Sequence, residues 1–229
     1  MNYQKNKYNL IYIFIFLCIA AVGINDSMGL SRGEFHPPIF YTTLSGLLCF
    51  IYFLFGFVKG IVYQIQGRDE ENFFVLPRFK GSVTIAITVT LLVYHFLVYE
   101  GPILSVDTDI YNIIKHYIVP IMVIAHYFLF DNKGIYKVID PIIWLVFPTC
   151  YFTWVNIKAA TVTGPYWDGK YYPYGFIDLT LHSVSEVAVT VVILFAFFTI
   201  LGFGLYAIDR KLAVKNHIYS YSNEMSKSL

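Results

Sequence analysis

The sequence predicts an all-α polytopic membrane protein, a bundle of six transmembrane helices with both termini in the cytoplasm. The first observation is composition, because 57% of the 229 residues are hydrophobic and only 14% are charged. A soluble domain carries about 25% charged residues. The second observation is that the apolar residues gather in six runs of roughly membrane-spanning length. The predicted spans are 8–24, 38–63, 82–99, 110–130, 139–160 and 187–208, within a single integral membrane domain of residues 1–229.

The third observation is the distribution of Lys and Arg, which predicts the orientation. Of the 16 Lys and Arg residues, twelve fall on one side of the six spans, and the other side holds Arg32, Lys115, Lys158 and Lys170. Cytoplasmic segments carry the excess of these residues, so the twelve mark the cytoplasmic side. We therefore expect a multi-pass protein of the cell membrane whose external segments are 25–37, 100–109 and 161–186.

The first run, Tyr8–Ile24, is predicted to be a retained helix. The residues Asn25–Ser27 that follow it offer no small-x-small cleavage pattern, so a signal peptide is not indicated. The three cysteines, Cys18, Cys49 and Cys150, lie inside apolar runs. An odd number of cysteines without external positions cannot form a disulfide framework, and we expect packed thiols.

The second and fourth spans carry polar groups near their external ends. Thr42 and Ser45, three residues apart, share one face of the second helix. The fourth run, Ile110–Phe130, contains Lys115, His116 and His126, and intramembrane ionisable groups are functional candidates because they are costly to bury. Pro120 cannot donate to the carbonyl of His116, so the helix is predicted to kink there.

The remaining segments are predicted from their flanks. Asp140, which precedes Pro141, is predicted to be a helix-end residue, and Asp209-Arg210-Lys211 is predicted to be a stop signal at the membrane face. The long external segment 161–186 is rich in tyrosine and is expected to fold over the outer mouth of the bundle, because exposed aromatics need burial or lipid contact. The cytoplasmic loop 64–81 mixes charges of both signs and is predicted to be a solvated hairpin.

Thr42 and His116 are the candidate catalytic residues. Counting from the outer ends of their helices, they lie about 6 Å and about 9 Å deep, so their side chains share a level. A hydroxyl and an imidazole at one depth match a nucleophile with its general base. The alternatives are a threonine that bonds within its own helix or to a neighbouring helix, and a packed histidine with a buried partner.

The other candidate residues would bind substrate near this pair. They are Ser45, Tyr94, His95, Lys115, Tyr172 and Tyr174. Donors for an oxyanion are expected among Tyr41, Tyr94 and Lys115. No cofactor is expected. A zinc site built from His36, His95, His116 and His182 is a further alternative, although no His-x-x-x-His spacing supports it.

Four patches of the sequence resemble the Pr6Pr family of bacterial integral membrane proteins. They are Phe40-Tyr41-Thr42-Thr43-Leu44-Ser45, His116-Tyr117-Ile118-Val119-Pro120, the proline and tyrosine of Pro148-Thr149-Cys150-Tyr151, and Tyr172-Pro173-Tyr174-Gly175-Phe176-Ile177-Asp178. That family is in turn similar to the androgen-induced-protein family, which hydrolyses fatty acid esters of hydroxy fatty acids with a threonine and a histidine. By motif position these residues correspond to Thr42 and His116. The chain departs from the pattern at Gly46, where asparagine is usual, and in a histidine-to-proline spacing shorter by one.

The sequence thus favours a membrane-embedded hydrolase of lipid-like esters. A non-catalytic lipid-binding or transport protein, in which the same polar groups hold a headgroup, is the alternative. The expected partners are membrane lipids or a fatty-acyl ester substrate. A net charge of +1, with no basic patch, gives no indication of nucleic-acid binding.

Overall fold

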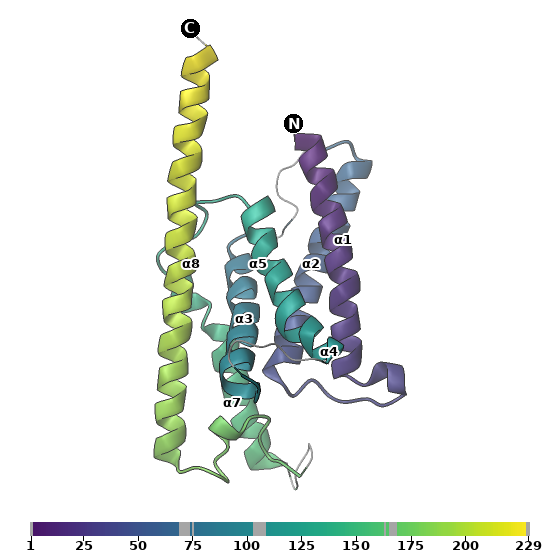
Figure 1. Cartoon of the computed structure of the whole chain (residues 1–229), viewed down its shortest axis with the longest axis vertical. Coiled ribbons are helices and arrows are strands. Elements are labelled where there is room, and N and C mark those ends of the chain that lie inside the picture. Colours follow the sequence, from purple (N-terminus) through teal and green to yellow (C-terminus); the bar gives the residue numbers. More distant parts are fainter. Residues whose placement is uncertain are drawn as a thin grey trace.

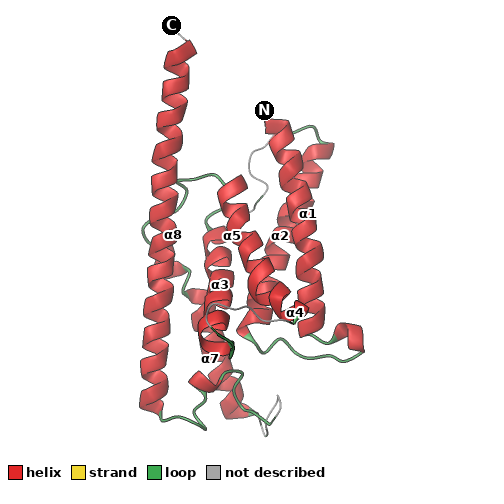
Figure 2. Cartoon of the chain, in the orientation of Figure 1, coloured by secondary structure: helices red, strands yellow, loops and turns green. Residues whose placement is uncertain are grey.

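The computed structural model describes residues 2–68, 74, 76–102, 109–162, 164 and 169–227, with side chains between residues 6 and 214. These residues form helices joined by loops, without a β-strand (Figure 2). Six helical segments are long and apolar enough to cross a membrane, which confirms the prediction of six spans. They are Asn6–Ser27, Tyr41–Ile65, Phe79–Val98, Ile110–Phe130, Asp140–Thr161 and Val184–Val214.

Two of the six spans contain a local change of helix type, and the fifth is divided by a short turn at residues 144–145. The α-helices are α1 (Asn2–Ser27), α2 (Tyr41–Ile65), α3 (Phe79–Val93), α4 (Ile110–Ile113), α5 (Val119–Phe130), α6 (Asp140–Ile143), α7 (Val146–Thr161) and α8 (Val184–Lys227). The third span continues from α3 into a π-helical turn, η2 (Tyr94–Val98), and the fourth joins α4 to α5 through a second one, η3 (Ile114–Ile118). Short 3-10 turns, η1 (Leu30–Arg32) and η4 (Gly175–Ile177), lie in the loops.

The helices form a bundle in which α3 is central. Figure 1 shows α1 and α2 along one edge, α8 along the opposite edge, and α3 and α5 between them. Half of the third span is buried, against 17% of the last. Gly81 permits close approach on this helix, because a side chain there would collide with the ring of Trp144. The outer face of α8 exposes residues such as Val189, Val192 and Ile200, which suits contact with lipid acyl chains.

The first turn of α1 and the last turns of α8 lie toward the same end of the bundle (Figure 1). We call this the termini end, and the opposite end the cavity end. An even number of spans requires this arrangement. The helix α8 is longer than predicted and continues to Lys227, beyond the expected end of the sixth span at residue 208.

The loop 64–81 differs from the solvated hairpin that was predicted. Helix α3 begins at Phe79, so Lys80 lies within the bundle and is only 2% exposed. Arg78, just before the helix, forms an ion pair with the buried Asp140 at the start of α6. The charges at the end of this loop therefore join helices together, while residues 69–73 and 75 lie outside the described part of the chain.

Close to Pro120, where a kink is predicted, the structure has the π-helical turn η3. Pro120 has no N–H for the carbonyl of His116, and the N–H of Val119 bonds to the carbonyl of Ile114, five residues back. The turn η2 has the same kind of bond, in which the N–H of Tyr99 donates to the carbonyl of Tyr94, five residues back, at 2.7 Å. Such π-helical turns are uncommon and occur frequently at functional sites.

Candidate functional site

A cavity of about 410 Å³ opens at the cavity end of the bundle, and every span contributes to its wall. Representative lining residues are Asp26 of α1, Thr42 of α2, Val89 of α3, His116 of η3, Tyr151 of α7 and Phe198 of α8. Most of the other lining side chains are apolar. The polar groups are concentrated where α1, α2 and η3 meet the loops, so the cavity has an apolar interior and a polar mouth.

Thr42 is the second residue of α2 and lines the cavity. The helix begins there because the backbone of Phe40, the preceding residue, is extended. The side chain of Phe40 does not cap the first N–H groups of α2. Ser45 lies one turn deeper and is fully buried. The Ser45 hydroxyl donates to the carbonyl oxygen of Thr42 at 3.1 Å and lies 2.7 Å from the hydroxyl of Thr90. Ser45 thus fixes the turn that carries Thr42, and does not line the cavity.

His116 lies on the π-helical turn η3 and is 8% exposed, at the cavity wall. Its Nδ1 is 3.1 Å from the carbonyl oxygen of Asn112. A carbonyl can only accept, so Nδ1 carries the hydrogen and donates it. In the neutral imidazole the lone pair is then on Nε2. This tautomer is the one that a general base acting through Nε2 requires.

Tyr94 holds the plane of this imidazole. The two rings stack in parallel, with centroids 3.5 Å apart and planes inclined by 3°. Tyr94 begins the turn η2 and His116 lies in η3, so both interrupted helices deliver their aromatic side chains to the same point. The stack and the bond to Asn112 together restrict both the tilt and the rotation of the ring.

Lys115, the neighbour of His116, lines the mouth of the cavity. Its Nζ lies 2.8 Å from Oδ2 of Asp26, at the end of α1. The other carboxylate oxygen of Asp26 accepts from Arg32 at 3.1 Å. Two cations therefore share one carboxylate at the mouth, which leaves a net positive charge among these three residues.

Tyr174 covers the start of α2 from the loop between α7 and α8. Its hydroxyl oxygen accepts the N–H of Tyr41 at 3.1 Å, and its ring meets Phe40 edge-on. Both Tyr174 and Phe176 line the cavity. The prediction that this loop folds over the mouth is confirmed for Tyr174.

Two of the remaining predicted residues, His95 and Tyr172, are not among the residues that line the cavity. His95 contacts the Tyr117 hydroxyl through Nδ1 at 3.0 Å, and Tyr172 is buried beside Asp178. Tyr41 lines the cavity, its backbone N–H bonds to the Tyr174 hydroxyl, and its own hydroxyl is buried without a hydrogen bond among the described residues. The structure thus brings together Thr42, Tyr94, Lys115, His116 and Tyr174.

Sequence reasoning missed Asp26, Asn112 and Tyr151 as parts of the site. In the sequence, Asp26 belongs to a segment without a cleavage pattern, which gives no indication of a site. Asn112 takes part through its backbone carbonyl, and only the fold of the helix below His116 reveals that contact. Tyr151 lies within one of the resemblance patches, and its hydroxyl donates to the carbonyl of Ile39 at 3.1 Å, which fixes the chain just before α2. In the described ranges no three His, Cys, Asp or Glu side chains come close enough to hold a metal ion.

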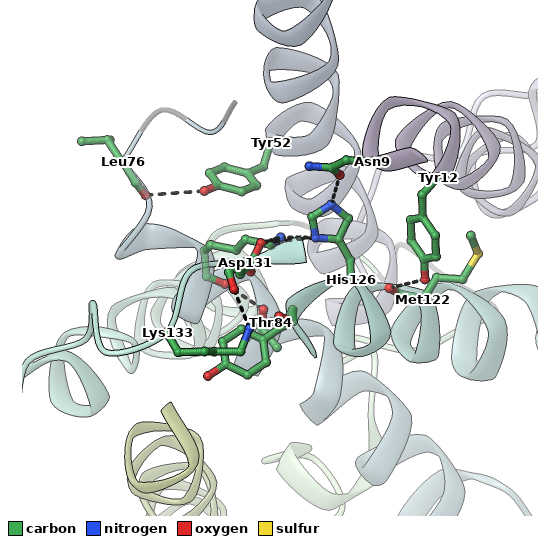
Figure 3. Close-up of polar contacts among 11 residues, drawn as sticks. Asn9, Tyr12, Tyr52, Leu76, Thr84, Met122, His126, Asp131 and Lys133 are labelled. Carbon is green, nitrogen blue, oxygen red and sulfur yellow. Dashed lines mark hydrogen bonds and ion pairs between the residues drawn. The ribbon is translucent and has the colours of Figure 1, made fainter. Parts of the chain in front are cut away.

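A second polar cluster lies at the termini end, and Figure 3 shows it in close-up. It consists of Asn9, Lys80, His126 and Asp131. The Nε2 of His126 lies 2.8 Å from Oδ1 of Asn9, and its Nδ1 contacts the ammonium of Lys80. Lys80 also donates to Asp131 at 2.6 Å. Each charge is thus compensated, and the cluster, which we call the Lys80 cluster, joins α1, α3 and α5.

No family model, curated protein or solved structure matches the chain in comparisons with known proteins. The relation to Pr6Pr proteins remains a prediction from the four sequence patches.

Proposed function

We propose that this protein is a membrane-embedded hydrolase of lipid-like esters, with Thr42 as nucleophile and His116 as general base. The observation that carries the proposal is that both residues line one apolar cavity, with the hydrogen of the imidazole on Nδ1 and directed to the carbonyl of Asn112. A threonine hydroxyl is a weak nucleophile until a base accepts its proton. A neutral imidazole with its lone pair on Nε2 is such a base.

The reaction follows from these two groups. The Thr42 oxygen attacks the acyl carbon, its proton passes to Nε2 of His116, and the carbonyl electron pair moves onto the oxygen. When the carbonyl re-forms, the bond to the alcohol breaks and His116 returns the proton to the leaving oxygen. A water molecule then attacks the acyl-threonine, giving its proton to His116. Collapse releases the fatty acid and restores the Thr42 hydroxyl with that proton.

The shape of the cavity supports a substrate with a long apolar acyl group. The interior is lined by side chains such as Val93, Leu194 and Phe198, which suit an acyl chain, and the mouth carries Asp26, Arg32 and Lys115. A substrate of the fatty acid ester of hydroxy fatty acid type, as the family resemblance implies, combines such chains with a polar end. The site would lie in the outer leaflet of the cell membrane, given the orientation expected from the Lys and Arg distribution.

Hydrolysis of a long-chain ester by purified protein in detergent tests the proposal. We expect the hydrolysis rate of Thr42→Val and of His116→Gln to be lower than that of the wild type by a factor on the order of 10²–10⁴. Thr42→Ser should retain part of the activity, because the nucleophilic oxygen survives. Thr88→Val and His182→Gln are matched controls, since both residues lie outside the cavity lining, and they should remain active. Wild-type rates in both Thr42→Val and His116→Gln would refute the proposed dyad.

A lipid-binding protein is the second candidate, and the mouth of the cavity favours it. Lys115 and Arg32 converge on Asp26 above an apolar chamber, an arrangement that would also hold an anionic headgroup without chemistry. A fluorophosphonate probe separates the two functions, because it labels only an activated hydroxyl. Labelling that disappears in Thr42→Val supports the hydrolase, and a protein that binds lipid but is not labelled supports the binding function.

A further inference from the structure

The start of α2 is capped by a residue far away in the sequence. The preceding residue, Phe40, provides no side-chain cap, and the first N–H groups of a helix have no partner within it. The hydroxyl oxygen of Tyr174 accepts the N–H of Tyr41 at 3.1 Å, and Thr42 is the next residue of the helix. The phenol of Tyr174 therefore sits on the positive end of α2, directly beside the candidate nucleophile.

The direction of this bond determines what the phenol can do. Its oxygen accepts a backbone N–H, and its single hydrogen is the group that it can donate. Thr42 and Tyr174 line the same cavity, and the side chains of Thr42 and Tyr151 both act on this phenol, lowering its pKa against the effect of burial. Burial raises the pKa of Tyr174, so the hydroxyl keeps its proton at neutral pH. The N–H bond polarises the O–H group and strengthens it as a donor.

When Thr42 attacks an ester, the carbonyl oxygen becomes negative. A hydrogen-bond donor stabilises this oxygen if it lies within about 3 Å of it. We propose that the Tyr174 hydroxyl is the oxyanion donor of this site, with the N-terminus of α2 polarising it from behind. The proposal rests on the hydrolase function proposed above and assigns to Tyr174 the donor role that was predicted for Tyr41. Tyr174 donates its hydrogen bond to the carbonyl oxygen as the electron pair moves onto it, and releases it when the carbonyl re-forms.

Steady-state hydrolysis by Tyr174→Phe is the first test. The kcat should fall on the order of 10²–10³-fold, as for the loss of one oxyanion donor, with KM nearly unchanged because the ground-state ester needs no such donor. Tyr171→Phe, an exposed tyrosine in the same loop, is the matched control and should be as active as wild type. Thr42→Val, measured in the same assay, distinguishes failure of the donor role of Tyr174 from failure of the hydrolase function. If Thr42→Val is inactive and Tyr174→Phe is fully active, the donor role is overturned and the hydrolase function stands, whereas a fully active Thr42→Val removes both.

An alkyl boronic acid distinguishes a donor from a helix cap. It forms a tetrahedral anion on the nucleophilic oxygen, so Tyr174→Phe should weaken its inhibition about as much as it lowers kcat. Inhibition at the wild-type level, together with a reduced kcat, would assign Tyr174 a purely structural role and overturn the proposal.

A second variant covers the case in which Tyr174→Phe does not fold. Replacement of Tyr174 by 3,5-difluorotyrosine keeps the ring and the hydroxyl but makes the phenol more acidic. Since a phenolate cannot donate, activity should fall at a lower alkaline pH than in the wild type. An unchanged pH profile in the folded, fluorinated protein would overturn the donor role.

Discussion

At the scale of single residues, the site depends on how His116 is held. The ring donates through Nδ1 to a carbonyl four residues earlier in its own helix and stacks on Tyr94. Neither of these two contacts involves a carboxylate, unlike a triad in which a carboxylate orients the base. The orientation of the proposed base therefore comes from helix geometry and from ring packing.

The Tyr94 ring can be tested separately from its hydroxyl. Tyr94→Phe keeps the stack, so we expect hydrolysis close to the wild-type rate. Tyr94→Ala removes the surface that fixes the imidazole plane, and since small misplacements of a catalytic group can cost about 10²-fold, its rate should fall at least tenfold. Equal activities of the two variants would contradict a positioning role for this ring. Circular dichroism of both proteins controls for folding.

At the scale of secondary-structure elements, two π-helical turns and one charged cluster define the bundle. The turns η2 and η3 each carry one partner of the Tyr94–His116 stack. At the termini end, the Lys80 cluster joins α1, α3 and α5 through buried polar contacts. The cavity end thus carries the uncommon helix geometry, and the termini end carries the compensated charges that hold three helices in place.

Pro120 is the residue whose chemistry favours the turn η3. Pro120→Ala supplies an N–H that can bond to the carbonyl of His116, and we expect the turn to tighten and His116 to rotate away from Tyr94. Ester hydrolysis should fall at least tenfold while helix content is retained. Pro141→Ala is the control, because Pro141 is in the first turn of α6, where a missing N–H breaks no helical bond. Full activity of Pro120→Ala would show that the turn does not depend on the proline.

Acid should weaken the Lys80 cluster through Asp131. Burial alone raises the pKa of Asp131, but Lys80 and His126 oppose it and hold the pKa below its usual value of 3.8. A lowered folded-state pKa means that the stabilisation is complete above pH 3.8 and is lost as pH falls through the folded value. We therefore expect the thermal midpoint in detergent to drop below about pH 4.

The variant Asp131→Asn tests whether Asp131 is the source of the acid sensitivity. Removal of one partner from a buried ion pair costs about 3–5 kcal/mol, so its thermal midpoint should already be reduced at neutral pH, with a smaller further loss in acid. Glu34→Gln, at an exposed position, should behave as wild type. An acid transition in Asp131→Asn as large as that of the wild type would place the sensitive group elsewhere.

At the scale of the whole molecule, the cavity exists only because all six spans close around it. The second and fourth spans bring Thr42 and His116, the first brings Asp26, and α7 and α8 provide much of the apolar wall. Helix α8 is anchored at the other end by the buried Asp209, which accepts from the Tyr127 hydroxyl at 3.0 Å and from the N–H of Tyr136 at 3.2 Å. Asp209, predicted from the sequence to be part of a stop signal, therefore also fastens α8 to Tyr127 of α5 and to the loop residue Tyr136.

Orientation in the membrane is testable by cysteine accessibility. In a variant whose three native cysteines are replaced by alanine, single cysteines at Ser222 and Lys170 should label from opposite sides, with Lys170→Cys accessible from outside the cell. The expectation follows from the twelve-to-four division of Lys and Arg. Labelling of both positions by an impermeant reagent on intact cells would contradict the six-span topology with internal termini.

The sequence by itself was sufficient for the six spans, and it predicted similar depths for Thr42 and His116, both of which line one cavity in the structure. Apolar runs of membrane-spanning length have few alternatives, because a backbone in hydrocarbon must satisfy its own hydrogen bonds, and depth along a helix follows from its rise per residue. The loss of the helical hydrogen bond at Pro120 was likewise predictable, since proline always lacks the donor.

Only the tertiary structure decided which polar groups meet. Lys80 lay in a segment predicted to be a solvated loop, yet it is buried because Asp131 and His126, more than 40 residues away, compensate its charge. Tyr174 reaches the start of α2 across 133 residues, and Ser45 faces Thr90 rather than the cavity. Helical periodicity gives the face and the depth of a side chain, but its neighbours depend on how each helix is rotated and packed, which the local sequence does not encode.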